Sequence, residues 1–449
     1  ATADGASIPW TPITDQQISS TSAIRLHSIL RAVTGNLDVV GGDTLGGFNP
    51  SYIPESELGL HEVLSPEQKA KQMGYDDHPV YTYRVAEMLK EPTEKVWGFP
   101  YADIVMGCHM ANPTNVFRAM KTEQPYPIKA FIVLGNNALL SYPNQHQILE
   151  AMMNQELIVA HELFMTPTAM LADYILPGDV FTERNHVADG WSWTTRLTLS
   201  QKVVEPPEQA SSSYQFWHDL AVRFGFGNEF PWQSIEEVLD HRLARSGRTF
   251  REFEEQGFME MPIPEYRKYR KTGFATPSGK VELYSSILEE LGFDPLPYYR
   301  EGPATSPEYP YMVFTGVRED PFFQTGQRNV KELRDRCPVP SVFIHPEDAT
   351  RDGLNDGDWI SLETPHGKVS AQLSVQSSMK QGHLRVPHGW WYPEMRGQES
   401  LAGAFLSSDA VLCSDDDEFL DYEQGIPHFK GFPGKVVKAE KPEHLQVAS

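Results

Sequence analysis

The chain has 449 residues, a length that predicts two or three domains because a single hydrophobic core rarely grows so large. Hydrophobic residues make up 40% and charged residues 22%, as in a soluble globular protein, and no apolar run approaches the roughly 20 residues of a membrane helix. The formal net charge of −23 argues against nucleic acid as a partner, since phosphate binding needs clustered lysine and arginine.

Cysteine and histidine usage excludes several kinds of metal site. Cys108, Cys337 and Cys413 lie far apart, and no C-x-x-C motif occurs. They can form neither a disulfide framework nor a four-thiolate zinc or iron–sulfur site. Neither His109 nor His186 has further ligands at metal-binding spacing, so we expect no metal ligand in this chain. The acidic composition is typical of a soluble cytoplasmic enzyme, and we expect a cytoplasmic location. No signal peptide is visible, but the sequence has no initiating methionine, so this absence says little.

The first part of the chain combines one amphipathic helix with a long irregular stretch. Apolar residues recur at helical spacing within residues 18–40, and Gly35-Asn36 ends the pattern. Residues 41–125 are rich in glycine and proline, with one helix expected near residues 84–90. An irregular stretch of this length usually lines a site or covers a surface.

From residue 127 the pattern becomes that of a β-α-β unit. Residues 128–135 form a continuous apolar strand, residues 145–153 a helix and residues 156–160 a second apolar strand. Polar residues follow the carboxyl ends of these strands, where open α/β sheets bind ligands. They are Gly135, Asn136, Asn137, Glu162, Thr166 and Asp173.

These polar residues allow two interpretations each. The amides of Asn136 and Asn137 could bind a phosphate or a ribose hydroxyl, or the segment could be an ordinary asparagine-rich turn. Glu162 could accept hydrogen bonds from ribose hydroxyls or a guanine edge, whereas Thr166 could cap a helix. No G-x-G-x-x-G motif and no Walker loop occurs, which disfavours a nicotinamide or ATP site.

The rest of the chain predicts a helical region followed by a barrel. Residues 211–300 are expected to be mainly helical, with a turn leading into a strand at 275–285, and a proline-rich linker follows at 300–310. Residues 342–344 are apolar, and residues 359–364 and 368–375 alternate apolar and polar side chains, as strands do. A helical turn separates the first two of these strands.

Two strand ends in the barrel carry candidate ligand-binding residues. Arg318 follows a strand and a glycine, and its guanidinium suits a phosphate or a pterin carbonyl, although a plain surface arginine fits the sequence as well. His388, next to Gly389, ends the strand at 383–387, where an imidazole and backbone donors could meet a ligand.

The order of these motifs, HPEDA, GLNDGDW, HGKV and LRVPHGWW, resembles the C-terminal cofactor-binding domain of the molybdopterin oxidoreductases, the dimethyl-sulfoxide-reductase superfamily. The segment from KAFIVLGNN to LADYILPGDVFTER resembles the second dinucleotide-binding domain of that family. SIPW, TPSGKVELYSS and DPLPYY resemble its acetylene hydratase branch, whose members use tungsten to add water to acetylene.

This resemblance implies an α/β fold, with parallel-sheet dinucleotide-binding domains and a C-terminal β-barrel of the six-stranded type. It also implies two molybdopterin guanine dinucleotides that hold one tungsten or molybdenum.

The cofactor-binding residues then expected are Gly135, Asn136, Asn137, Glu162, Thr166, Asp173, Thr315, Gly316, Arg318, Gln324, Gln327, His388, Gly389, Trp390, Ser407 and Lys430. Ser407 stands where the family has an asparagine, which puts that contact in doubt. Trp10 and Trp191 match aromatic members of an apolar substrate pocket.

The resemblance also implies that part of the enzyme lies elsewhere. The family's cysteine motif for an iron–sulfur cluster, its metal-ligating cysteine and its catalytic carboxylate precede the matching region, so we expect no catalytic residue here. The chain opens as if within a domain, and we expect a fragment, a processed half or a split-gene product that needs its N-terminal half or a partner chain. A redox enzyme for formate, a sulfur compound or an oxyanion, and a non-catalytic pterin-binding subunit, remain alternatives.

Four segments follow from this interpretation. They are residues 1–45, the end of an α/β domain begun elsewhere; 46–125, an irregular connecting region near the active site; 126–300, the dinucleotide-binding domain with a helical insertion; and 301–449, the barrel.

Overall fold

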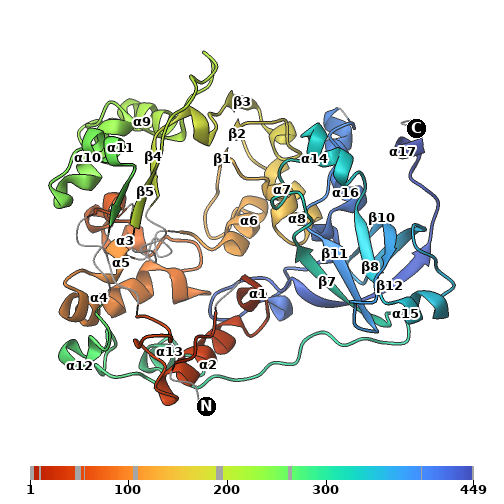
Figure 1. The fold of residues 1–449 in the computed structure, drawn as a ribbon, viewed down its shortest axis with the longest axis horizontal. Helices are drawn as coiled ribbons and strands as arrows, with labels where there is room; N and C mark the ends of the chain where they lie inside the picture. Colours follow the sequence, from red (N-terminus) through yellow and green to blue (C-terminus); the bar gives the residue numbers. More distant parts are fainter. Residues whose placement is uncertain are drawn as a thin grey trace. The chain divides into compact units, whose positions relative to one another are not determined.

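The computed structural model describes residues 5–9, 12–45, 52–54, 56–104, 110–188, 196–260, 265–395 and 397–446 (Figure 1). The chain forms two compact units. The first comprises Ala1–Thr11, Thr21–Pro113 and Leu176–Tyr298, and the second comprises Pro12–Ser20, Thr114–Ile175 and Tyr299–Ser449. Within the described ranges, no helix is both long enough and apolar enough to cross a membrane.

The first unit is mainly helical around a small antiparallel sheet. Its helices are α2 (Ser20–Val33), α3 (Pro66–Lys69), α4 (Tyr83–Trp97), α5 (Tyr101–Ile104), α9 (Ser213–Arg223), α10 (Ile235–Leu243), α11 (Phe250–Gln256), α12 (Tyr269–Thr272) and α13 (Ser286–Glu290). The sheet has the order β4 (His186–Ala188), β5 (Arg196–Ser200) and β6 (Phe258–Glu260). Leu197 of β5 and Leu243 and Phe253 of the helices are fully buried in one core.

The second unit begins with α1 (Pro12–Asp15) and contains a three-stranded sheet with its helices. These elements are α6 (Pro113–Thr122), β1 (Ala130–Leu134), α7 (Ala138–Ser141), α8 (Gln145–Met153), β2 (Leu157–Glu162) and β3 (Tyr174–Pro177). β1 and β2 pair in parallel, with Ala130 opposite Leu157. The Asn144 side chain caps α8 by accepting a hydrogen bond from Gln147 N, and the helix buries Ile148 and Met152 at helical spacing.

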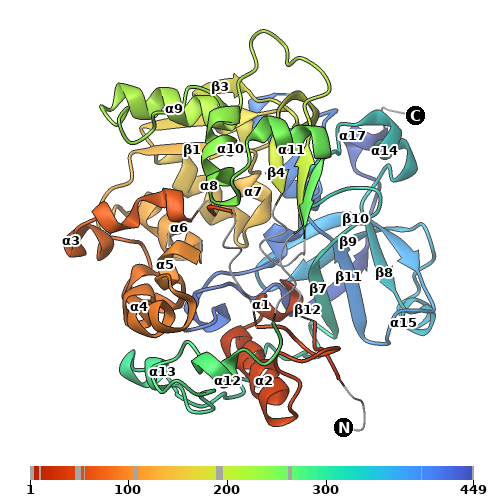
Figure 2. The same ribbon diagram turned by 60° about the vertical axis from the view of Figure 1, so that its left-hand side comes forward.

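The same unit ends in a closed six-stranded barrel (Figures 1 and 2). Its elements are β7 (Tyr311–Val317), α14 (Lys331–Arg336), β8 (Ser341–Ile344), α15 (Pro346–Arg351), β9 (Trp359–Thr364), β10 (Gly367–Val375), β11 (His383–Pro387), α16 (Ala404–Ser407), β12 (Lys430–Lys438) and α17 (Glu443–Gln446). The strands follow the order β10-β8-β11-β7-β12-β9. Alternate side chains, such as Ile360 and Leu362 of β9, are fully buried inside, which is the period of two that the sequence shows.

The sheet and the barrel of the second unit share one core. Trp391 and Ala404, which follow β11, pack with Leu139 and Leu140 of α7. Polar contacts add to this packing, because the buried Asp415 carboxylate accepts a hydrogen bond from Asn144 Nδ2 at 2.7 Å and another from the Gln147 side chain. The strand ends of the sheet and of the barrel therefore belong to one packed body.

The structure corrects several expected elements. The first helix spans Ser20–Val33 rather than 18–40, and α4 extends to Trp97, between the Thr82 and Gly98 caps. The stretch 41–125 also contains α3, α5 and α6. The strand expected within 275–285 does not form, because the Glu282 carboxylate accepts hydrogen bonds from the nearby Ser278 and Ser286 amides and holds the segment in turns.

Candidate cofactor site

The ends of β7 and β11 lie close together and share several hydrogen bonds. The two strands pair in parallel, so their carboxyl ends lie at the same edge. We call the group at this edge the barrel cradle; it consists of Thr315, Gly316, His388, Gly389, Asp409 and Lys430.

Asp409 lies at the centre of the barrel cradle with no exposed surface. Its carboxylate accepts hydrogen bonds from Gly316 N at 2.6 Å and Gly389 N at 2.7 Å, and both oxygens lie 3.2 Å from His388 Nδ1. Burial opposes ionisation, but His388 and the two backbone donors outweigh it and lower the pKa of Asp409. The carboxylate is therefore an anion inside the protein.

Two glycines of the cradle have a backbone conformation that disfavours a side chain. Gly316 has φ +67° and Gly389 φ +57°, a region that residues with a Cβ rarely adopt. A Cβ on Gly316 would lie 2.6 Å from Lys430 Nζ, and one on Gly389 would lie 2.3 Å from Thr325 Cγ2. The backbone conformation therefore favours glycine at both strand ends, and at Gly389 a side chain would also meet Thr325, whereas at Gly316 the end of the flexible Lys430 side chain could move.

Lys430 supplies a largely buried cation next to Asp409. Its ammonium group donates a hydrogen bond to the Thr315 carbonyl, and burial lowers the pKa of Lys430 despite the neighbouring carboxylate. Thr315 is fully buried, donates to the Phe429 carbonyl and has Cys413 Sγ 3.3 Å from its hydroxyl. Ammonium and backbone N–H donors are the groups that bind phosphate oxygens.

The loop after β7 packs against this edge through a buried arginine. Arg328 is 1% exposed, lies over the Phe322 ring at 4.0 Å and donates hydrogen bonds to the carbonyls of Gly326 and His388. Burial lowers the pKa of Arg328 to about 10. The guanidinium thus fastens the loop to the end of β11.

Three predicted residues of this loop face solvent. Arg318 is exposed and lies over the Phe323 ring at 5.1 Å. Gln324 and Gln327 are also exposed and have φ of +51° and +67°, strained values for residues other than glycine. The loop holds these amides and the guanidinium outward, where a ligand can reach them.

On the sheet, the turn after β1 and the segment after β2 meet. Asn137 Oδ1 accepts hydrogen bonds from Thr168 Oγ1 at 2.7 Å and Thr168 N at 3.3 Å, while Asn137 Nδ2 is buried without a partner. Gly135, with φ +56°, has no atom within 4 Å of the position of a Cβ. Asn136 is exposed and hydrogen-bonds Tyr142. The Asn137 Nδ2 group is therefore free to donate a hydrogen bond to a ligand, next to the unobstructed backbone of Gly135.

Glu162 ends β2 at this same edge. Burial raises the pKa of its carboxyl group, although Leu163 N donates to it at 3.1 Å. Thr166 is buried and its hydroxyl accepts from Ala169 N at 3.1 Å, which is the capping role allowed by the sequence. Asp173 lies elsewhere: its carboxylate accepts from Ile158 N at 2.8 Å, near the start of β2, four residues before Glu162.

Two predicted residues occupy interior positions. Trp390 is fully buried against Phe322 and Tyr392. Ser407 is 2% exposed, donates to the Ser370 carbonyl at 2.7 Å and lies 2.8 Å from the Tyr392 hydroxyl. Both side chains are buried in the protein, Trp390 in a cluster separate from the core inside the barrel, and their predicted contact with cofactor stays a prediction. Trp10 and Trp191 lie outside the described residues.

Three residues of the site were missed in the sequence: Thr168, Arg328 and Asp409. Asp409 stands alone in the apolar run DAVLC, and a single acid in such a run indicates a buried charge that needs partners. Its partners lie 93 and 20 residues away, so the sequence does not reveal them. Arg328 and Thr168 carry no comparable signal.

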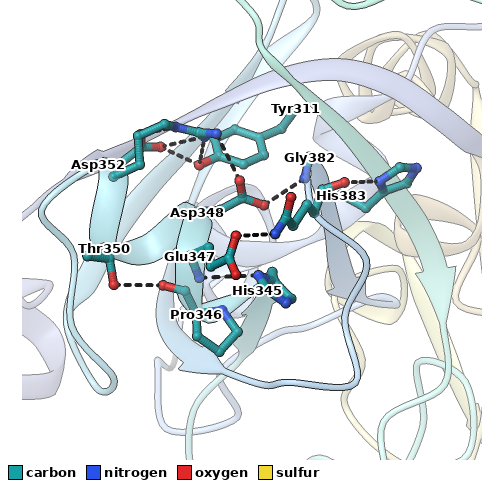
Figure 3. Close-up of polar contacts among 11 residues, drawn as sticks. Tyr311, His345, Pro346, Glu347, Asp348, Thr350, Asp352, Gly382 and His383 are labelled. Atoms are coloured by element: carbon teal, nitrogen blue, oxygen red, sulfur yellow. Dashed lines mark hydrogen bonds and ion pairs between the residues drawn. The ribbon is translucent and has the colours of Figure 1, made fainter.

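A second polar cluster, around α15, has its groups paired internally (Figure 3). Arg351 donates to the Tyr311 hydroxyl at 2.7 Å and to Asp348 at 2.9 Å, and Asp348 also accepts from Gly382 N at 2.6 Å. Glu347 and Thr350, which line a shallow hollow on α15, are bonded to Gln381 and to the Pro346 carbonyl. These contacts hold α15 against the barrel.

Comparison with known proteins identifies the family of the chain. Residues 64–223 match the model of the family described as Molybdopterin oxidoreductase, and residues 312–416 match the Molydopterin dinucleotide binding domain, which contains most of the barrel cradle. The chain belongs to the molybdopterin oxidoreductase superfamily. The α/β fold with a parallel sheet and a six-stranded barrel, expected from the sequence, is confirmed.

Individual relatives in this superfamily differ in activity. Acetylene hydratase of Syntrophotalea acetylenica is 44% identical over 98% of this chain, and dopamine dehydroxylase of Eggerthella lenta is 25% identical over 92%. The solved structure of acetylene hydratase from Pelobacter acetylenicus matches 98% of the chain with a TM-score of 0.92 and 43% identity. The chain spans 61% of the length of both acetylene hydratases and 46% of the dehydroxylase.

The described residues fit a molybdopterin dinucleotide. The barrel cradle offers a lysine, an imidazole and a glycine backbone that a Cβ would obstruct. The sheet offers the unpartnered amide of Asn137 and the half-buried Glu162 carboxyl group. Donors of this kind bind diphosphate oxygens, and a carboxylate accepts from ribose hydroxyls or guanine.

Proposed function

We propose that the chain is the C-terminal portion of an enzyme that hydrates acetylene, or a similarly small alkyne, to an aldehyde without net oxidation or reduction. The observation that carries this proposal is the 44% identity to acetylene hydratase over 98% of the chain, with relatives of other activities at 25–27%. The matching acetylene hydratase structure has a TM-score of 0.92.

The part of this chain in the reaction is to bind and orient the cofactor. Lys430, His388 and the backbone of Gly389 would hold a guanine dinucleotide at the barrel, and Asn137 and Glu162 would hold one at the sheet. When bound, the tungsten or molybdenum of the two dinucleotides would supply Lewis acidity toward water or the alkyne. Trp10 and Trp191 would line an apolar pocket that admits a two-carbon substrate and excludes bulk water.

The remaining groups would come from sequence outside this chain. The relatives are longer than the matched region, since the chain spans 61% of acetylene hydratase. An N-terminal segment or a partner chain would then carry the iron–sulfur cluster, the cysteine that binds the metal and the carboxylate that moves the proton. Water adds across the triple bond, so the product has the atoms of one alkyne and one water.

The test measures two activities on the full-length protein, purified from cells supplied with tungstate or molybdate. Aldehyde formation from acetylene is the expected result, with little dye-linked turnover of formate or sulfur oxyanions. Trp191→Ala should lower alkyne turnover and leave bound pterin unchanged. Dye-linked turnover without aldehyde would instead identify a redox enzyme of the same superfamily, and pterin without either activity a binding subunit.

A further inference from the structure

The buried carboxylate of Asp409 joins two segments that are far apart in the sequence. Oδ2 accepts from Gly316 N at the end of β7, and Oδ1 accepts from Gly389 N after the end of β11. His388 Nδ1 lies 3.2 Å from both oxygens. The carboxylate thus contacts donors from both strand ends, and it has no exposed surface through which water could replace them.

A carboxylate is needed because the two backbone N–H groups meet different oxygens. Asparagine has one acceptor oxygen, so its NH₂ group would face either Gly316 N or Gly389 N, donor against donor. A buried donor without an acceptor costs about 1–3 kcal/mol, and the strand end would move to find another partner. Asp409 therefore determines both the position and the charge of the cradle.

The contact also determines which histidine nitrogen is available. Because Nδ1 faces an ionised carboxylate, it carries hydrogen and donates to Asp409. Nε2 is then the nitrogen left for a ligand, and it donates to a phosphate oxygen when the ring is the imidazolium, in which both nitrogens carry hydrogen. Arg328 holds the same residue from the other side, through the His388 carbonyl at 3.0 Å.

We propose that Asp409 is a positioning residue, which holds the Gly316 and Gly389 backbones and directs His388 Nε2 toward the diphosphate of a bound guanine dinucleotide. This inference rests on the proposed binding of cofactor to the barrel cradle. Asp409 does not touch the ligand; it acts through His388 and the two glycines, as outer partners of ligand-binding histidines do elsewhere.

The test compares two buried aspartates in the full-length protein. Asp409→Asn keeps the shape but removes one acceptor. Asp415→Asn is the matched control, because Asp415 is 4% exposed and hydrogen-bonded by Asn144 and Gln147, away from the cradle. Bound dinucleotide is measured as GMP released by acid per protein molecule. We expect Asp409→Asn to lose about half of this GMP, the share of the one dinucleotide of two that the barrel cradle would hold, because loss of an outer partner weakens binding by about tenfold or more. Asp415→Asn should match the unaltered protein at comparable thermal stability.

A second measurement needs no stable Asp409 variant. The ¹⁵N spectrum of histidine-labelled, unaltered protein should show a protonated Nδ1 for His388, assigned by loss of the signal in His388→Gln. A His388 with bare Nδ1 would overturn the inference, as would equal GMP content in Asp409→Asn and unaltered protein. Equal losses in the two aspartate variants would mean that Asp409 is merely structural. Unaltered protein without GMP would overturn the cofactor proposal itself.

Discussion

Several charged side chains lie close together at the barrel cradle, and they are buried or partly buried. Arg328 is 1% exposed and Asp409 is not exposed at all, and Lys430 lies largely buried beside them. Arg328 and Lys430 are thus two cations near Asp409, and a second carboxylate, Glu319, also acts on Arg328. Arg328 Nε is buried without a hydrogen-bond partner, so the set has a donor that the protein does not use internally, and such a donor favours binding an anion such as a diphosphate.

Glu162 provides a test at the sheet edge through its dependence on pH. Burial raises the pKa of its carboxyl group in the folded state, so the stability that it contributes is present at low pH and is lost as the pH rises through that pKa. Glu162→Gln is neutral throughout and should lose less stability over this range. Melting temperatures of cofactor-free protein against pH check the prediction, with Glu156→Gln, the exposed residue just before the same strand, as control. Parallel curves for Glu162→Gln and unaltered protein would contradict it.

The positions of individual candidate residues in the fold were predictable from sequence only where a strand end identified them. The apolar strand patterns end at Gly135, Glu162 and His388. The structure places each of these residues at, or directly after, the carboxyl end of a strand. Asp173 also follows such a pattern, yet its carboxylate bonds to Ile158 N near the start of β2. The position of such a side chain depends on its hydrogen-bond partner elsewhere in the chain, and a single sequence does not show which residues become partners.

At the scale of elements, the site depends on two loops that fit against each other. The loop after β7 contributes Thr325 and Arg328, and the loop after β11 contributes Gly389 and Trp391. Trp391 Nε1 donates to the Thr325 carbonyl at 2.8 Å, so the loops are joined by hydrogen bonds on both sides of the close approach at Gly389. Contacts between the two loops therefore hold both of them in place without a ligand.

Replacing Gly389 with alanine tests this fit. Gly353→Ala is the control, since Gly353 has φ +66° but no atom within 4 Å of a Cβ. The control should lose roughly 1–2 kcal/mol from backbone strain alone. Gly389→Ala should lose about 1–3 kcal/mol more, because its Cβ would meet Thr325 at 2.3 Å. Urea unfolding measures the free energy of unfolding of both variants. Equal losses would show that the two loops move apart at little cost to make room for the added Cβ.

Periodic elements were predictable and isolated ones were not. The helix at 145–153 and the barrel strands at 359–364 and 383–387 match the expected ranges, because buried positions recur with a fixed period. The helix at Pro113–Thr122 was missed within a glycine-rich and proline-rich stretch, although Phe117 and Met120 are buried at helical spacing. Local side-chain hydrogen bonds at Glu282 prevented the expected strand.

At the scale of the whole molecule, the fold supplies binding edges but few groups for redox chemistry. Burial raises the pKa of Cys337 to about 11, and burial also raises the pKa of Cys413. A four-iron cluster is held by four cysteine thiolates. Cys108 lies outside the described residues, and three cysteines are in any case fewer than the four that such a cluster takes.

The 449-residue chain expressed alone should therefore contain no stoichiometric iron. Elemental analysis of the purified chain measures iron, tungsten and molybdenum together. Co-expression with a segment that carries the cysteine motif is the positive control, and it should restore about four irons per complex if the cluster is of the four-iron kind. The chain's own part would then be limited to binding the dinucleotides, at edges that are already built into the sheet and the barrel. Iron retained by the isolated chain would show that its thiols ligate metal after all, and would remove the reason to expect a second segment.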